Sequence, residues 1–134
     1  MTDIVDRTRI AYAHWQMRLS PAGSSAGLGQ IAAGLDDLDQ AIHTIVLTEK
    51  GTLPLQPEKC TRLLPFVDKP PNEAIPNFTR EIWDAITTWE PRIIVESVTP
   101  MARGFSHWAF PVFWYPRADV SRQIRLTEVT YGQA

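Results

Sequence analysis

The sequence predicts an α+β fold in which two main helices pack on a small, mainly antiparallel sheet formed largely by C-terminal strands. Apolar residues recur at intervals of three and four in segments 34–48 and 73–89, which is the spacing of amphipathic helices. Apolar and polar residues alternate in segment 92–99 and, with a slip between Leu126 and Val129, in segment 122–131, as they do in strands. Segment 105–115 is also predicted to be a strand, with apolar residues on both faces. Short turns between these strands indicate antiparallel pairing, and helices followed by strands are typical of the α+β class.

A chain of 134 residues is long enough for one main domain with its own core. We expect an N-terminal arm at residues 1–33 and the main domain at 34–134. Within the arm, alternating apolar residues predict a short strand at 14–19, and small residues predict a loop at 20–29. Segment 60–67 predicts a short helix between the two long ones.

Charge and composition narrow the range of functions. The chain has 13 Lys and Arg residues against 15 Asp and Glu residues, a net charge of −2, so we expect no nucleic-acid partner. Its single cysteine, Cys60, excludes an internal disulfide and a cysteine-cluster metal site. No apolar run approaches the roughly 18 residues of a membrane span. The start of the chain, residues 1–7, lacks the apolar core of a secretory signal.

The first long helix is expected over residues 34–48. Asp36 and Asp37 fall in its first turn, where carboxylates complement the unpaired backbone amides and the positive helix end. Gly51, preceded by Lys50, is a natural stop signal. The apolar stripe that we expect to be buried consists of Leu35, Leu38, Ile42 and Ile45.

The second long helix ends at a corner formed by Glu90, Pro91 and Arg92. Pro91 blocks continuation of the helix and pushes Glu90 towards extended backbone. Three interpretations of the charged pair stay open: an ion pair within the chain, a fork by which Arg92 binds a partner's carboxylate or carbonyl, and catalysis. The apolar stripe that leads to the corner consists of Ile75, Phe78, Ile82, Ala85, Ile86 and Trp89.

The strand at 105–115 is aromatic on both faces. One face carries Trp108, Phe110, Val112 and Trp114, and the other carries His107, Ala109, Phe113 and Tyr115. Pro111 has no N–H for the ladder, so we expect this strand to be an edge strand or to be bulged there. An uncovered aromatic edge promotes aggregation. Either a helix of the same chain or a partner chain would cover it, and the sequence leaves both open.

The sequence gives only weak evidence for a catalytic or metal-binding site. Glycoside cleavage needs two carboxylates about 5 to 10 Å apart, and the acidic candidates around the second helix are Glu81, Asp84, Glu90 and Glu96. A metal would be held by Asp36, Asp37, Asp39 and His43. Surface charge and helix capping explain both sets better. The sequence has no phosphate-binding glycine loop, zinc-protease motif or nucleophile elbow. We therefore expect no catalytic, metal-binding or cofactor-binding residues.

Four segments together resemble the phage baseplate assembly protein W family. They are the helix start at 34–42, the turn at 47–52, Pro57 and the corner at 89–93. This family comprises lysozyme-like wedge proteins of contractile-tailed phage baseplates, with relatives in type VI secretion baseplates. The sequence departs from the family at Lys59 and Cys60, where the family often has an aromatic residue followed by glycine.

The resemblance implies a structural, non-enzymatic component of a contractile tail baseplate that binds the wedge core and initiates sheath assembly. Its partners would be other wedge proteins, the tail sheath protein and the central hub or tube, with several copies in a sixfold assembly and no membrane. It would be a virion component that assembles in the host cytoplasm. A tail-associated, lysozyme-like muramidase is the alternative. The partner-binding residues expected on this basis are Glu90, Pro91, Arg92, Trp108, Phe110, Trp114, Ile124 and Leu126.

Overall fold

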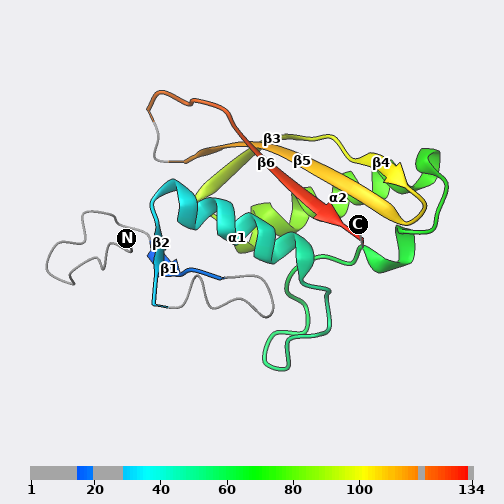
Figure 1. Ribbon diagram of the computed structural model, residues 1–134, viewed down its shortest axis with the longest axis horizontal. Helices are drawn as coiled ribbons and strands as arrows, with labels where there is room; N and C mark the ends of the chain where they lie inside the picture. Colours follow the sequence, from blue (N-terminus) through cyan, green and yellow to red (C-terminus); the bar gives the residue numbers. More distant parts are fainter. Residues whose placement is uncertain (1–14, 20–28, 118–119, 133–134) are drawn as a thin grey trace, which may run out of the picture. The chain divides into compact units, whose positions relative to one another are not determined.

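The computed structural model describes residues 15–19, 29–117 and 120–132 of the chain (Figure 1). The chain divides into two units, residues 1–41 and 42–134, with the boundary inside the first helix. Two helices and two antiparallel sheets confirm the α+β class. The elements, in chain order, are β1 (Trp15–Met17), β2 (Ile31–Ala33), α1 (Leu35–Leu47), the 3-10 helix η2 (Leu64–Phe66), α2 (Pro71–Trp89), β3 (Ile93–Val98), β4 (Met101–Gly104), β5 (His107–Pro116) and β6 (Arg125–Tyr131).

The first unit contains a small hairpin and the start of α1. The strand expected at 14–19 is present as β1, and it pairs antiparallel with β2, a three-residue strand that the sequence pattern did not predict. Gln40 of α1 joins the pair, because its side-chain amide donates to the Met17 carbonyl (2.9 Å) and accepts from the Leu19 amide (3.0 Å). Most of the loop expected at 20–29 lies outside the described residues.

Both long helices are present with bounds close to those predicted. Gly34 has a φ of +63°, so the chain turns sharply before α1. The helix α2 begins earlier than expected, at Pro71, because proline is well accommodated at the first helical position. Its buried face is made by Ala74, Phe78, Ile82, Ala85 and Ile86. Among the described residues, no helix is both long and apolar enough to cross a membrane.

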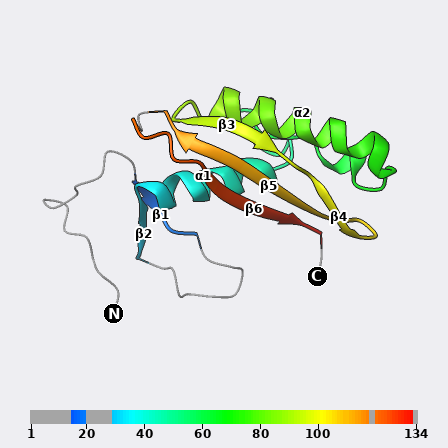
Figure 2. The same ribbon diagram turned by 90° about the horizontal axis from the view of Figure 1, so that it is seen from above.

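The main sheet is antiparallel, and β5 is its central strand (Figure 2). The strands β3 and β4 pair one after the other with the two halves of β5, and β6 pairs with β5 as well. The prediction of an edge strand at 105–115 was therefore wrong. The segment between the predicted strands 92–99 and 105–115 is also not simply a turn, because most of it is the short strand β4.

Pro111 is tolerated in the central strand because of where the neighbouring strands break. The carbonyl of Pro111 accepts a hydrogen bond from the amide of Thr99 (3.1 Å), in the two-residue connection between β3 and β4. In an antiparallel strand the N–H and C=O of one residue point to the same side. The side of Pro111 that lacks an N–H therefore faces the β3–β4 connection. Between Val98, the last residue of β3, and Met101, the first residue of β4, the neighbouring strand is interrupted.

The aromatic face of β5 is covered by α2, which answers the question that the sequence left open. The centre of the Phe78 ring lies 4.7 Å from the centre of the Trp108 ring and 5.0 Å from that of the Phe110 ring, and both contacts are edge-on. The buried indoles keep their hydrogen bonds: Trp108 Nε1 donates to the Val67 carbonyl (3.0 Å), and Trp114 Nε1 donates to the hydroxyl of a threonine on β6 (2.7 Å). This face of the sheet is thus the core of the second unit.

Candidate partner-binding site

The corner after α2 is closed by a bidentate ion pair. Arg92 Nε donates to Glu90 Oε1 (2.6 Å), and Arg92 Nη2 donates to Glu90 Oε2 (2.8 Å). The Glu90 side chain is 9% exposed, and that of Arg92 is 31% exposed. The first interpretation, an ion pair within the chain, is therefore present, and the guanidinium remains the more accessible partner.

The position of Glu90 explains why the pair is needed. Its amide donates to the Ile86 carbonyl (2.9 Å), so its carboxylate lies at the C-terminal end of α2. A negative charge there is opposed by the helix dipole, and burial removes its hydration. The positive charge of Arg92 offsets both the dipole repulsion and the lost hydration. Pro91 lies between Glu90 and Arg92 and holds their side chains on one short, rigid turn.

Arg117 fixes the same corner, and sequence reasoning missed it. Its backbone amide donates to the Arg92 carbonyl (2.9 Å), and its Nε donates to the Pro91 carbonyl (2.8 Å). Arg117 directly follows β5, so it ties the end of the central strand to the corner. No local pattern signals this contact, because the residues lie 26 positions apart.

The eight predicted partner-binding residues fall into two groups. Trp108, Phe110 and Trp114 are at most 2% exposed and contact their own chain. Ile124 and Leu126 are 53% and 55% exposed, at the start of β6. The structure thus leaves Pro91, Ile124 and Leu126 exposed and Arg92 partly exposed on the second unit, and it buries Glu90 as well as the three large aromatic residues. Binding of a partner by any of the eight stays a prediction.

The sheet face opposite α2 also carries apolar side chains. Phe113 of β5 pairs with Leu126 of β6, and Tyr115 pairs with Ile94 of β3, so their side chains share one face. Phe113, Tyr115 and Ile94 are half-buried. The Arg103 guanidinium and the Glu128 carboxylate meet at 2.8 Å between β4 and β6, across β5.

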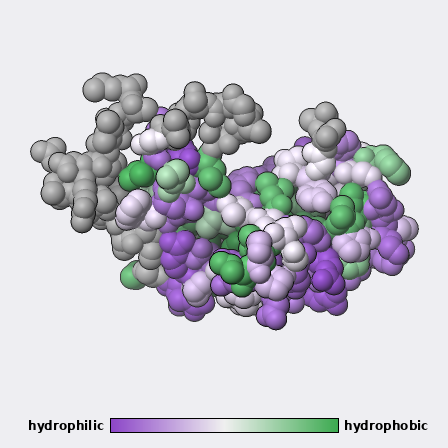
Figure 3. All heavy atoms as spheres, turned by 90° about the horizontal axis from the view of Figure 1, so that it is seen from below, coloured by the Kyte–Doolittle hydropathy of each residue, from purple (hydrophilic) through white to green (hydrophobic). Residues whose placement is uncertain are grey.

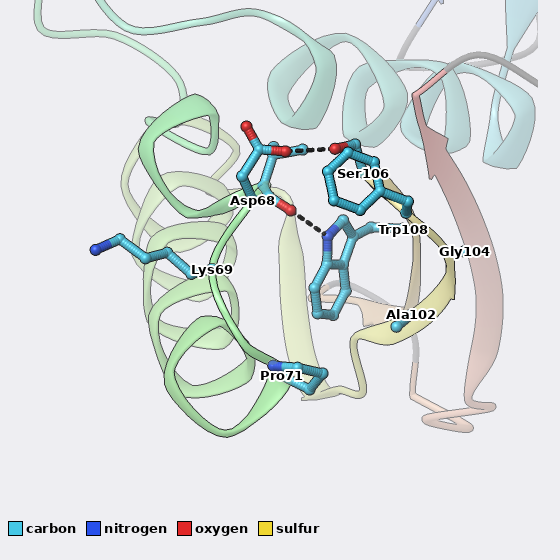
Figure 4. A pocket seen from close by; sticks show the side chains of 9 residues that line it. Asp68, Lys69, Pro71, Ala102, Gly104, Ser106 and Trp108 are labelled. Atoms are coloured by element: carbon cyan, nitrogen blue, oxygen red, sulfur yellow. Dashed lines mark hydrogen bonds between the residues drawn. The ribbon is translucent and has the colours of Figure 1, made fainter.

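A small pocket of about 160 Å³ lies between the turn that precedes α2 and the β4–β5 hairpin (Figure 4). Its walls are held together by the hydrogen bond from Trp108 to Val67 and by a second bond from the Ser106 hydroxyl to the Asp68 carboxylate. Phe105, at the hairpin tip, is 89% exposed. The pocket has a single carboxylate, that of Asp68, so it lacks the pair that glycoside cleavage requires.

The other candidate acids have ordinary surroundings. Glu81 accepts a hydrogen bond from the Arg62 amide (3.4 Å) and lies 3.8 Å from the Arg80 guanidinium, while Asp84 and Glu96 are exposed. Within residues 15–19, 29–117 and 120–132, no three His, Cys, Asp or Glu side chains cluster closely enough to hold a metal ion.

Cys60, where the sequence departs from the baseplate family pattern, has a glycine-like backbone. Its φ is +81°, in the left-handed region that favours glycine. The side chain is buried, and this burial raises the pKa of the thiol, although the charge of Lys59 and a hydrogen bond with Thr48 act in the opposite direction. The thiol therefore behaves as a small buried apolar group.

The hydrophobic surface on one side of the molecule is scattered. Figure 3 shows a mostly hydrophilic face on which hydrophobic side chains form several separate patches. The strongly exposed apolar residues of the second unit include Leu55, Leu64, Phe105 and Val120. Isolated apolar residues of this kind are common on protein surfaces.

The fold has known relatives among solved structures. A candidate tail lysozyme from Geobacter sulfurreducens matches with a TM-score of 0.64 and 20% identity, over 89% of this chain and 98% of that chain. A chain of the baseplate complex from the type VI secretion system matches with a TM-score of 0.62 and 17% identity, over 72% of this chain and 92% of that chain. The chain shares its fold with a baseplate protein. No protein-family model and no curated protein sequence matches it.

Proposed function

We propose that this chain is a structural component of a contractile tail or secretion baseplate, where it binds the wedge core and initiates sheath assembly. The observation that carries the proposal is the likeness of fold to a chain of the type VI secretion baseplate complex, over 92% of that chain. In this role the protein would act in the virion baseplate, after assembly in the host cytoplasm, among several copies around a sixfold axis.

The geometry of the corner supports binding rather than catalysis. A carboxylate that is already paired with a guanidinium at 2.6 and 2.8 Å is a poor general acid or nucleophile. A corner held by Arg92, Pro91 and Arg117 instead presents backbone and charge in one fixed arrangement, which lowers the entropic cost of binding. Wedge proteins would meet the corner, and the sheath protein would meet the outer edge of β6.

A tail-associated muramidase remains the second candidate, since one structural relative is a candidate tail lysozyme. The two functions are separated by expressing the chain with the baseplate proteins encoded beside it. Complex formation is measured by light scattering, and peptidoglycan hydrolysis is measured on the same samples. We expect a stable complex and no hydrolysis. Hydrolysis by a chain that ignores these proteins would overturn the proposal.

Matched variants test the corner itself. Arg92→Lys keeps the positive charge but removes the planar fork. Arg103→Lys makes the same change in the Arg103–Glu128 pair on the sheet, which is exposed and lies away from the corner. We expect the first variant to weaken the complex about tenfold, a change of about 1.4 kcal/mol, and the second to leave it unchanged. Equal effects of the two variants would mean that the corner only supports the fold.

A further inference from the structure

The connection between α1 and η2 contains a loop, residues 51–59, whose two ends are tied together. The Lys50 amide donates to the Thr61 carbonyl (2.7 Å), and the Thr61 amide donates to the Thr48 carbonyl (3.3 Å). Thr61 is 0% exposed, and its hydroxyl donates to the Val46 carbonyl (3.0 Å). The base of the 51–59 loop is therefore fixed to the end of α1. Figure 1 shows the loop reaching beyond the helices and the sheet of the second unit.

Two proline-containing turns give the 51–59 loop a defined shape. Residues 53–56 and 56–59 each form a β-turn, closed by a hydrogen bond from the last amide to the first carbonyl, of 3.3 Å and 3.1 Å. Pro54 and Pro57 occupy the second position of these turns, where the fixed φ of proline is favourable. A loop that is already ordered in this way loses little conformational freedom when it binds a partner.

The first of these turns holds an apolar side chain in water. Leu55, at its third position, is 95% exposed. Exposed apolar residues are common by themselves. Leu55 differs because both the base of the loop and the turn around it are closed by hydrogen bonds, so the side chain is held away from the core. The hydrophobic gain from covering it is available to a partner molecule.

The 51–59 loop adjoins the corner after α2. Lys59 Nζ lies 5.9 Å from the centre of the Trp89 ring, within the range of a cation–π interaction. Trp89 is the last residue of α2 and directly precedes Glu90. Within the described part of the chain, no carboxylate forms an ion pair with the Lys59 ammonium. The loop and the corner are thus neighbouring surfaces of the second unit, with an unmatched positive charge between them.

We propose that the 51–59 loop is a preformed docking loop, which places Leu55 in an apolar pocket of the same wedge protein that meets the corner. An acidic side chain of that partner lies beside Lys59, since a carboxylate complements an ammonium that has no ion-pair partner in its own chain. Leu55 supplies the apolar anchor, and the two turns supply the rigidity. The inference rests on the proposed function for the identity of the partner.

The first experiment tests the shape of the free loop. Relaxation of ¹⁵N in the full chain without partners gives the order parameters of the Leu55 and Glu58 amides. We expect values of about 0.85, as in rigid backbone. Values below about 0.6, as in flexible chain, would overturn a preformed loop whatever the baseplate proteins do.

The second experiment tests the anchor, with the full chain and the baseplate proteins encoded beside it. We expect Leu55→Asp to weaken the complex 10- to 100-fold and Phe105→Asp to weaken it less than twofold. Phe105 is 89% exposed as well, but it precedes β5, whereas the corner is tied to Arg117 after β5. Both variants should melt at the temperature of the wild type, because both side chains are exposed.

Two further comparisons test the turns and the charge. Pro54→Ala combined with Pro57→Ala keeps Leu55 but frees both turns, and we expect it to bind about 3- to 10-fold more weakly. Lys59→Arg keeps the positive charge and should bind as the wild type does, whereas Lys59→Gln should bind at least threefold more weakly. Equal binding by the two Lys59 variants would overturn the acidic contact.

The outcomes separate this inference from the proposed function. If the wild type forms the complex and Leu55→Asp forms it equally well, the docking loop is overturned and the proposed function stands. If the wild type itself forms no complex, the proposed function fails and the docking loop fails with it. Loss of the complex in Leu55→Asp, with an unchanged melting temperature and a normal complex in Phe105→Asp, supports both.

Discussion

The Glu90 carboxylate and the Arg92 guanidinium form two parallel hydrogen bonds across the proline that follows α2, at 2.6 and 2.8 Å. The pair turns the chain from a helix into the sheet without leaving a buried charge unmatched. Removing one partner should therefore cost more than removing both. This asymmetry leads to the first prediction.

Arg92→Ala should lower the free energy of unfolding by about 2 kcal/mol, because it leaves the Glu90 carboxylate nearly buried at a helix C-terminus without its partner. The double variant Glu90→Gln with Arg92→Ala should recover about half of that loss. Urea denaturation of the wild type, both single variants and the double variant measures the coupling. Additive losses in this cycle would show that the pair contributes nothing of its own.

Phe78→Ala should be among the most damaging single changes, with a loss of about 3 to 5 kcal/mol. Phe78 is 0% exposed and contacts the rings of Trp108 and Phe110, so its removal leaves a cavity between α2 and β5. Trp83→Ala on the same helix is the control, because that side chain is 38% exposed. Thermal unfolding followed by near-ultraviolet circular dichroism should separate the two variants, and similar melting temperatures would contradict this account of the core.

Gly132→Ala should be far more destabilising than Gly51→Ala. Both glycines have positive φ, +106° and +98°, so the backbone strain of alanine is common to both variants. A Cβ at Gly132 would lie 2.7 Å from the Ser106 carbonyl oxygen and 2.8 Å from His107 Nδ1, whereas a Cβ at Gly51 meets nothing within 4 Å. We expect an additional loss of about 1 to 3 kcal/mol at Gly132. Equal chemical denaturation midpoints would rule out the close contact with the hairpin.

Cys60→Gly should be at least as stable as Cys60→Ala, against the usual order of these residues. Both variants lose the buried thiol, but only alanine keeps the strain of a side chain at a φ of +81°. We expect glycine to gain about 1 kcal/mol over alanine. Denaturation curves of the two purified variants give the comparison, and a clear advantage of alanine would mean that the loop does not hold this backbone conformation in solution.

Alkaline pH should destabilise the protein partly through Cys60. Burial raises the pKa of its thiol above 9.0 in the folded chain. At lower pH the thiol is protonated in both the folded and the unfolded chain, so the contribution of the buried thiol to stability is complete there. As the pH rises above 9.0, the unfolded chain ionises first, and the free energy of unfolding falls. Burial and the nearby Glu49 also raise the pKa of Tyr131, which extends the fall above pH 10.0. Cys60→Ala should show a smaller decrease between pH 8 and 10 than the wild type. The same decrease in both would exclude the thiol as its cause.

The sequence by itself determined the elements whose pattern is local. Apolar spacing located α1 and α2, alternation located β1, β3 and β6, a run of aromatic and other apolar residues located β5, and Pro91 located the corner. Each of these signals depends on neighbours within a few residues. The tertiary structure alone decided the order of the strands. Pro111 indicated an edge, yet β5 is central, since a missing N–H costs little where the neighbouring strand is interrupted. Likewise, only the folded chain brings Arg117 onto the Pro91 carbonyl and covers Phe110 with Phe78, because these contacts join segments far apart along the sequence, and no local pattern encodes them.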